Sequence, residues 1–171
     1  MPVEIVMCDI TKMKVDAIVN AANTSLLGGG GVDGAIHKAA GPRLLEECKK
    51  LNGCKTGEAK ITAAYNLSAR YVIHTPGPVY KDGKSGEAAL LASCYRSCLR
   101  LAREYNCTGL AFPCISTGVY GYPKNEAARI AVHEIRNFLR KNGDCLQVYI
   151  VCFDKDSLAV YKESEAQNTE V

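Results

Sequence analysis

"NAANTSLLGGGGVDGAIH", residues 20–37, connects a short apolar run to a helical pattern through four consecutive glycines. Glycine loses more backbone entropy on folding than other residues, but it adopts positive φ readily and lets a ligand approach the main chain closely. A helix that begins directly after such a run offers unpaired N–H groups and the positive end of its dipole. The stretch therefore predicts a loop that holds a phosphate group, and a flexible glycine turn without a ligand is the alternative.

Residues 29–34 of this stretch formally fit the dinucleotide fingerprint GxGxxG, so a nicotinamide-dependent dehydrogenase must be considered. That fingerprint requires the glycines immediately after a strand, and a second strand that ends in an acidic residue about 20 residues later. Here "NAANTSLL" comes between the apolar run and the glycines, and residues 35–52 have a helical pattern. A GxxxxGK[ST] sequence does not occur either. Another kind of phosphate loop is therefore indicated.

A second loop of the same form is "PCISTGVYGYP", residues 113–123. It follows the strand-like run "GLAF", places Gly118 and Gly121 beside Ser116 and Thr117, and ends where a proline begins a helix. Ligands of open α/β sheets bind in the crevice at the carboxyl ends of the strands. Two such loops therefore predict a crevice that holds a diphosphate from both sides.

Short apolar runs alternate with helical patterns along the chain, which predicts a three-layer α/β/α sandwich with a mixed, mostly parallel sheet. The predicted strands cover residues 3–7, 17–20, 59–62, 71–74, 109–113 and 146–153, and the predicted helices cover 34–41, 42–51, 86–106, 123–143 and 157–164. We expect one domain over residues 1–165, because no linker, repeat or shift in composition divides the chain. The polar residues 166–171 are predicted to be a frayed tail.

The composition excludes several classes of protein. The net charge of +3 is too small to indicate nucleic-acid binding, and neither a signal peptide nor an apolar run of about 18 residues occurs. The nine cysteines form no CxxC pair and the three histidines lie apart from them, so neither disulfides nor a metal site is expected. Cys114 has no histidine close in sequence and is not assigned as a nucleophile. The sequence indicates a cytoplasmic monomer without a membrane segment.

Five blocks of sequence together carry a resemblance to a known family. They are "CDITKMKVDAIVNAAN" (8–23), "GGVD" (30–33), "CKTGEAKIT" (54–62), "YVIHTPGP" (71–78) and "FPCISTGVYGYP" (112–123). In this order they resemble the MacroD-type macrodomains, a family that binds ADP-ribose and includes mono-ADP-ribosyl hydrolases and O-acetyl-ADP-ribose deacetylases. The chain departs from the family pattern at Cys8, where a glycine is usual. A side chain there is expected to crowd the adenine end and to affect affinity mildly rather than the chemistry.

The resemblance implies a role for each residue of the site. Asp9 would accept a hydrogen bond from the adenine amino group, Ile10 would line the same pocket, and Phe153 would cover the base. The diphosphate would be bound by main-chain N–H groups of two loops: Gly30, Gly31 and Val32 on one side, and Ser116, Thr117, Gly118 and Val119 on the other.

The distal ribose, which carries the leaving group, would lie against Tyr120. By the same resemblance Asn20 and Asn23 would position that sugar, and Asp33 would orient or activate the attacking water, with help from the substrate's own phosphate. Taken without the family, Asp33 is equally consistent with an acid that caps a helix, and Asn23 with a residue that forms a turn.

The sequence is consistent with two functions. The favoured one is a hydrolase that needs no metal or cofactor, and that releases ADP-ribose from mono-ADP-ribosylated acidic side chains and from O-acetyl-ADP-ribose. Its partners would be ADP-ribose, its esters and mono-ADP-ribosylated proteins. The alternative is a non-catalytic module that reads ADP-ribose without removing it. Because Asn23 and Asp33 are both present, the hydrolase is preferred.

Overall fold

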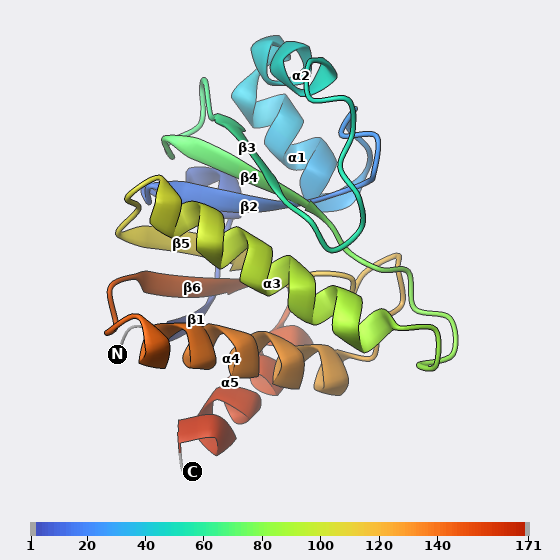
Figure 1. Ribbon diagram of the computed structural model, residues 1–171, viewed down its shortest axis with the longest axis vertical. Coiled ribbons are helices and arrows are strands. Elements are labelled where there is room, and N and C mark those ends of the chain that lie inside the picture. The colour runs from blue at the N-terminus through green and yellow to red at the C-terminus, as the bar shows by residue number, and fades with distance from the viewer. Residues whose placement is uncertain (1–2, 170–171) are drawn as a thin grey trace.

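The computed structural model describes residues 3–169, and its six strands form a single sheet (Figure 1). The strands are β1 (Val3–Met7), β2 (Ala17–Ala22), β3 (Lys60–Ala63), β4 (Tyr71–Pro76), β5 (Gly109–Pro113) and β6 (Gln147–Cys152). Their order is β1-β6-β5-β2-β4-β3, and all neighbours are parallel except the antiparallel pair β3 and β4 at one edge. The sheet is therefore mixed and mostly parallel, as predicted.

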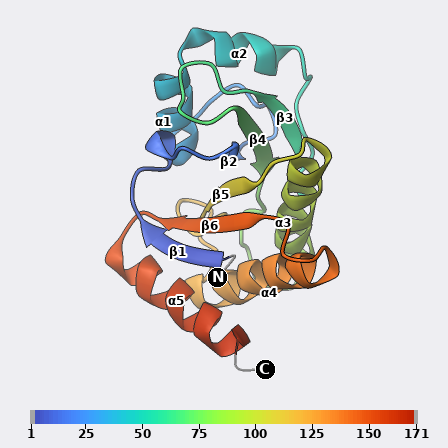
Figure 2. The same ribbon diagram turned by 90° about the vertical axis from the view of Figure 1, so that its left-hand side faces the viewer.

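Helices cover both faces of the sheet. They are α1 (Gly31–Ala40), α2 (Pro42–Lys49), α3 (Glu87–Glu104), α4 (Lys124–Lys141) and α5 (Lys155–Thr169), with a 3-10 helix η1 (Ile10–Lys12) after β1. Alternate residues of a strand point to opposite faces, so Val19 and Ile73 join the apolar core under α3 and α4, whereas Ile18 and Val72 join the core under α1 and α2. Figures 1 and 2 show these layers, which confirm the predicted three-layer sandwich.

The order of the strands places a crevice between β2 and β5. These strands are parallel neighbours, with Ala17 opposite Leu110 and Ile18 opposite Ala111. From β2 the chain continues to α1 on one face, and from β5 it continues to α4 on the other. The two connections therefore diverge at the carboxyl ends of adjacent strands, which is where open α/β sheets bind their ligands.

Most boundaries lie within two residues of the prediction, and two differ by three residues or more. Helix α1 begins at Gly31, three residues before the predicted start, so Asp33 lies in its first turn. The fraying of residues 166–171 stays a prediction, and residues 170 and 171 lie outside the described part of the chain. Helix α5 continues to Thr169, five residues beyond its predicted end at residue 164. The reason is a tertiary contact, because Arg136 of α4 forms an ion pair with Glu165 and holds this end of α5. No helix within residues 3–169 is both long and apolar enough to cross a membrane.

Candidate functional site

A cavity of about 1150 Å³ opens at the carboxyl ends of β2, β5 and β6. Its walls come from η1, the loop after β2, the first turn of α1, the loop after β5 and the start of α5. All the residues that the sequence analysis assigned to the site line this cavity except Asn20; they are Asp9, Ile10, Asn23, Gly30, Gly31, Val32, Asp33, Ser116, Thr117, Gly118, Val119, Tyr120 and Phe153. Residues far apart in the sequence are thus brought together in one place.

The glycine loop leaves its main chain open toward the cavity. Gly30 precedes α1 without a side-chain cap, and a Cβ atom at Gly30 or Gly31 would meet no other atom within 4 Å. Gly31 has φ +57°, a left-handed conformation that favours glycine. The unpaired N–H groups at the start of α1 and its dipole therefore suit an anion in this part of the cavity.

The second loop is held in a strained conformation close to β4. Ser116 is buried and has φ +67°, which is uncommon for a residue with a side chain, and its Oγ has no hydrogen-bond partner among the described residues. A Cβ at Gly77 would lie 2.3 Å from Ser116 Oγ and 2.7 Å from Ile115 Cγ2. Gly77 therefore permits this close approach, a role that the sequence analysis missed although it quoted the motif containing this glycine.

The end of the cavity near η1 is open to solvent. Asp9 caps η1, and its Oδ1 accepts hydrogen bonds from Thr11 N at 3.0 Å and Thr11 Oγ1 at 2.6 Å, which lower the pKa of the Asp9 carboxyl. Ile10 is buried beside it, whereas the side chain of Phe153 is 96% exposed. Cys8 also lines the cavity, and burial raises the pKa of its thiol. An acceptor and a free aromatic face at one end suit a flat, amino-bearing ring.

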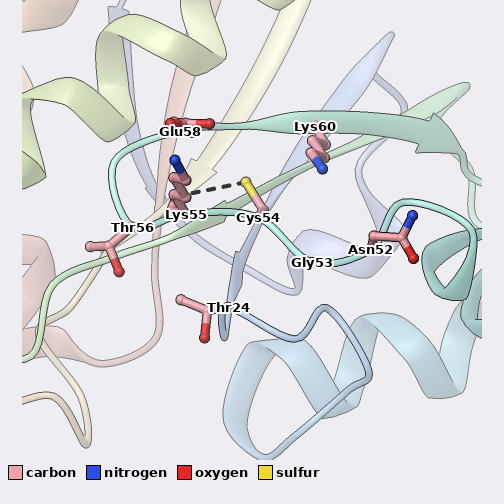
Figure 3. A pocket seen from close by; sticks show the side chains of 8 residues that line it. All are labelled: Thr24, Asn52, Gly53, Cys54, Lys55, Thr56, Glu58 and Lys60. Atoms are coloured by element: carbon pink, nitrogen blue, oxygen red, sulfur yellow. Dashed lines mark hydrogen bonds between the residues drawn. The ribbon is translucent and has the colours of Figure 1, made fainter.

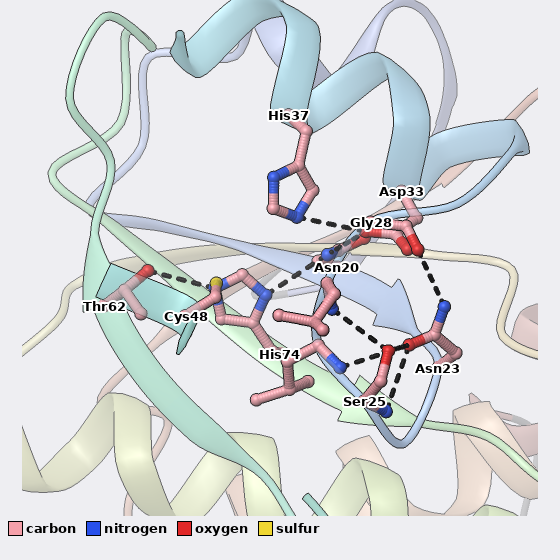
Figure 4. A network of polar contacts seen from close by, with 11 residues as sticks. Asn20, Asn23, Ser25, Gly28, Asp33, His37, Cys48, Thr62 and His74 are labelled. Carbon is pink, nitrogen blue, oxygen red and sulfur yellow. Dashed lines mark hydrogen bonds and ion pairs between the residues drawn. The ribbon is translucent and has the colours of Figure 1, made fainter. Parts of the chain in front are cut away.

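Asp33 lies at the opposite end and is almost fully buried. Its Oδ1 accepts a hydrogen bond from Asn20 Nδ2 at 2.8 Å and lies 3.4 Å from His37 Nε2, one helical turn further along α1 (Figure 4). A Cβ at Gly29 would lie 3.1 Å from Asp33 Oδ2, so that oxygen faces the glycine loop. The carboxyl group is therefore fixed through one oxygen and presents the other toward residues that line the cavity.

The structure places Asn20 differently from the other residues assigned to the site. Asn20 is 0% exposed and does not line the cavity; its side chain lies behind Asp33 instead. All but one residue of β2 is buried, so the apolar pattern of the sequence does not reveal which face of the sheet each side chain occupies. Asn20 therefore contacts Asp33 in this structure, and its contact with a sugar stays a prediction.

Asn23 holds the loop that leads to the glycines. Its Oδ1 accepts hydrogen bonds from Ser25 and from Leu26 N, and its Nδ2 donates to Gly28 O at 2.8 Å. Asn23 is thus a turn-forming residue, the alternative that the sequence left open, and it also lines the cavity. Its contact with a sugar stays a prediction.

Lys124 and Cys114 also line the cavity and carry ionisable groups. The Nζ of Lys124 lies 2.9 Å from Asp156 Oδ2 and 3.7 Å from Asp154 Oδ1, so its charge is already paired. No sequence pattern marks Lys124 as a residue of the site, because a lysine at the start of a helix is ordinary. The thiol of Cys114 contacts Cys152 Sγ at 3.8 Å, and this contact together with burial raises the pKa of Cys114, which disfavours a nucleophilic thiolate.

A second, smaller cavity of about 520 Å³ lies beside the chain that leads into β3 (Figure 3). It is lined by Thr24, Asn52, Gly53, Cys54, Lys55, Thr56, Glu58 and Lys60, none of which the sequence analysis assigned to a site. The ammonium group of Lys60 donates to Leu51 O at 2.7 Å and thus serves the fold. Within residues 3–169, no group of three or more His, Cys, Asp or Glu residues is arranged to hold a metal ion.

Comparison with known proteins agrees with this geometry. The family model described as "Macro domain" matches residues 19–131. A macro domain-containing protein of Methanosarcina mazei is 63% identical over 156 residues, which are 91% of this chain and 83% of that protein. A protein of Salmonella gallinarum named O-acetyl-ADP-ribose deacetylase is 52% identical over 92% of this chain and 90% of its own length.

Two further matches come from a longer protein and from a solved structure. The ADP-ribose glycohydrolase MACROD2 of Xenopus laevis is 55% identical over 90% of this chain, which corresponds to 37% of its own length. A mutant macrodomain of Oceanobacillus iheyensis, solved with ADPR, superposes with a TM-score of 0.95 at 45% identity and covers 99% of this chain and 94% of its own. With the family model matching more than half of its residues and relatives this similar along nearly its whole length, the chain belongs to the macrodomain family.

Proposed function

We propose that this protein is a hydrolase that binds ADP-ribose and releases it from mono-ADP-ribosylated acidic side chains and from O-acetyl-ADP-ribose. The observation that carries the proposal is the position of Asp33, a buried carboxyl group in the wall of a cavity that also contains two glycine-rich loops. The printed names of the Salmonella gallinarum and Xenopus laevis relatives support the same class of reaction.

In this proposal the ligand lies along the length of the cavity. Asp9, Ile10 and Phe153 bind the adenine. The main chains of the two loops bind the diphosphate: Gly30, Gly31 and Val32 on one side, and Ser116, Thr117, Gly118 and Val119 on the other. Tyr120 and Asn23 contact the distal ribose, which places the ester bond of that sugar next to Asp33.

Asp33 acts on water rather than on the sugar itself. Both proposed substrates are esters of the distal ribose, so one molecule of water is consumed, and ADP-ribose and a carboxylic acid are formed. Asp33 Oδ2 orients this water, and the anionic diphosphate bound next to α1 assists it by accepting a hydrogen bond. No step of the proposal requires a metal ion, and among the described residues none of the His, Cys, Asp and Glu side chains form a cluster for one.

The setting of the reaction is also a proposal. We propose a single macrodomain over residues 1–165 that acts as a monomer in the cytoplasm on mono-ADP-ribosylated proteins. All nine cysteines are free thiols in the structure, which is typical of a reducing compartment.

The test is the release of ADP-ribose from a glutamate-linked mono-ADP-ribosylated protein, with a chelator present. We expect release by the wild type, a loss of at least about 100-fold with Asp33→Ala, and an unchanged rate with Glu163→Gln, which removes an exposed carboxylate far from the cavity. ADP-ribose binding by both variants is measured in parallel by calorimetry. If the wild type binds ADP-ribose but releases none, the protein is a reader.

A further inference from the structure

A row of buried polar side chains runs beneath Asp33, in a core that is otherwise apolar. Asn20 of β2, His74 of β4 and Thr62 of β3 are each at most 2% exposed, and they lie on three strands that are neighbours in the sheet (Figure 4). Asn20 and His74 are directly opposite each other in the register of β2 and β4. Burying polar groups is costly unless they form hydrogen bonds, so the hydrogen bonds among these side chains indicate the role of the row.

The hydrogen bonds of Asn20 fix the orientation of its amide. Its Nδ2 lies 2.8 Å from Asp33 Oδ1 and 3.2 Å from His74 Nδ1, so each of its two hydrogens has one acceptor. If the amide oxygen and nitrogen were exchanged, the oxygen would face the carboxylate of Asp33 without a hydrogen between them. The donor therefore has to lie on the Asp33 side.

The donors and acceptors around the ring also determine the tautomer of His74. Because an amide nitrogen only donates, Nδ1 of His74 has to accept and carries no proton. The ring proton is then on Nε2, which lies 3.0 Å from Thr62 Oγ1 and 3.8 Å from Cys48 Sγ. Burial, with a smaller effect of nearby His37, lowers the pKa of His74 to about 3, so the ring is neutral.

No other side-chain hydrogen bond within the described residues holds this amide in place. Asn20 Oδ1 is buried and has no hydrogen-bond partner, so the bonds to Asp33 and His74 are the only hydrogen bonds of the described residues that fix the orientation of the Asn20 side-chain amide. Without an acceptor at Nδ1, the second hydrogen of Asn20 would be buried without a partner, and the amide would turn to satisfy it. Asp33 Oδ1 would then lose its fixed donor.

We propose that His74 is a positioning residue for Asp33. Its unprotonated Nδ1 holds the amide of Asn20 so that this amide donates to Asp33 Oδ1, which keeps Asp33 Oδ2 directed toward the glycine loop and the cavity. This inference rests on the proposed function, in which Asp33 Oδ2 orients the attacking water. His74 itself touches no substrate, because it does not line the cavity.

The test compares three variants of buried residues in the same row. His74→Leu removes the acceptor at Nδ1, and His74→Asn restores one because its side-chain oxygen takes the place of Nδ1. Thr62→Val removes only the nearer of the two partners of Nε2. We expect His74→Leu to lower kcat by about 10- to 100-fold with the ADP-ribose Kd changed by less than about threefold, and His74→Asn to recover most of that loss. Thr62→Val should stay within about threefold of the wild type.

A spectroscopic measurement keeps the inference testable if His74→Leu fails to fold. Two-bond ¹H–¹⁵N correlation spectra of the wild type should show His74 as the neutral Nε2–H tautomer from pH 5 to 8. A proton on Nδ1, titration within that range, an unchanged kcat in His74→Leu, or an equal loss in Thr62→Val would each overturn the proposal. If the wild type releases no ADP-ribose, the proposed function fails as well, whereas an active wild type with an equally active His74→Leu rejects only the role of His74.

Discussion

The two ends of the cavity are built in different ways. At the end near η1, Phe153 is 96% exposed and Asp9 is held only by a neighbouring threonine. At the other end Asp33 is 4% exposed, and side chains from two adjacent strands fix it from behind. The open end can lose one contact with a modest loss of affinity, whereas the buried end depends on the hydrogen bonds that connect Asp33 through Asn20 to His74. Binding and turnover should therefore respond to different substitutions.

The largest effect is expected between these ends, at the glycine loop. Gly31→Glu should lower the affinity for ADP-ribose by about 100-fold or more, because a carboxylate would face the diphosphate. The matched control is Gly143→Glu, since Gly143 also has positive φ and open space around its Cβ but lies beyond the end of α4. Calorimetry measures both, and similar affinities for the two variants would show that the loop after β2 does not bind the phosphates.

The buried end should make the fold sensitive to acid. The native structure lowers the pKa of His74 from 6.5 to about 3, so the unfolded chain takes up this proton first as the pH falls. The free energy of unfolding is therefore unaffected by this group above pH 6.5, and it falls progressively as the pH is lowered from 6.5 to about 3.

Substitution of His74 measures this contribution. Between pH 6 and 4 the free energy of unfolding of the wild type should fall by about 1.4 kcal/mol per pH unit more steeply than that of His74→Asn. Asp33, His37 and Cys48, the ionisable groups around this ring, are the same in both proteins. Urea unfolding at a series of pH values checks the difference, and parallel pH profiles would show that His74 titrates normally.

At the open end, a substitution should weaken binding and leave turnover nearly unchanged. Phe153→Ala should weaken ADP-ribose binding about tenfold, because stacking of a base on an aromatic ring contributes about 1–3 kcal/mol, and should leave kcat within about twofold. Tyr105→Ala removes another exposed aromatic side chain that does not line the cavity and serves as the control. A fall in kcat with an unchanged Kd would mean that Phe153 acts on the reaction instead of on the base.

The smallest effect is expected at Cys8. Its side chain lines the open end, where solvent and neighbouring side chains can adjust around one sulfur atom. Cys8→Gly should therefore change the Kd of ADP-ribose by less than about threefold. A tenfold gain in affinity would show instead that this thiol crowds the adenine.

The sequence predicted the fold well because its signals are local. Apolar runs bounded by glycine, proline and polar residues marked every strand, and Pro42 and Pro123 marked the starts of two helices. The start of α1 was placed too late, because Gly31 begins it with a backbone conformation that no pattern reveals. The end of α5 was missed because Arg136, which holds it, is far away in the sequence.

The sequence predicted part of the site, but it did not predict the row of buried polar side chains beneath Asp33. The residues that line the cavity lie in loops whose glycines and polar residues are visible in the sequence, and the family resemblance supplied their roles. The direction of Asn20 depends on which face of β2 is covered by α1, and both faces are buried. The contact of His74 with Asn20 depends on the pairing of β2 with β4, and that of Gly77 with Ser116 on the fold of the second loop. These contacts depend on the tertiary structure, so a single sequence does not reveal them.

The most direct test of the difference between the two ends is single-turnover kinetics with saturating O-acetyl-ADP-ribose, together with ADP-ribose binding, for Asp33→Asn and Phe153→Ala side by side. Asp33→Asn keeps the size of the side chain and an oxygen that can accept from Asn20. We expect a rate constant at least about 100-fold lower with nearly normal affinity for Asp33→Asn, and nearly normal turnover with weaker binding for Phe153→Ala. A normal rate constant in Asp33→Asn would contradict this expectation.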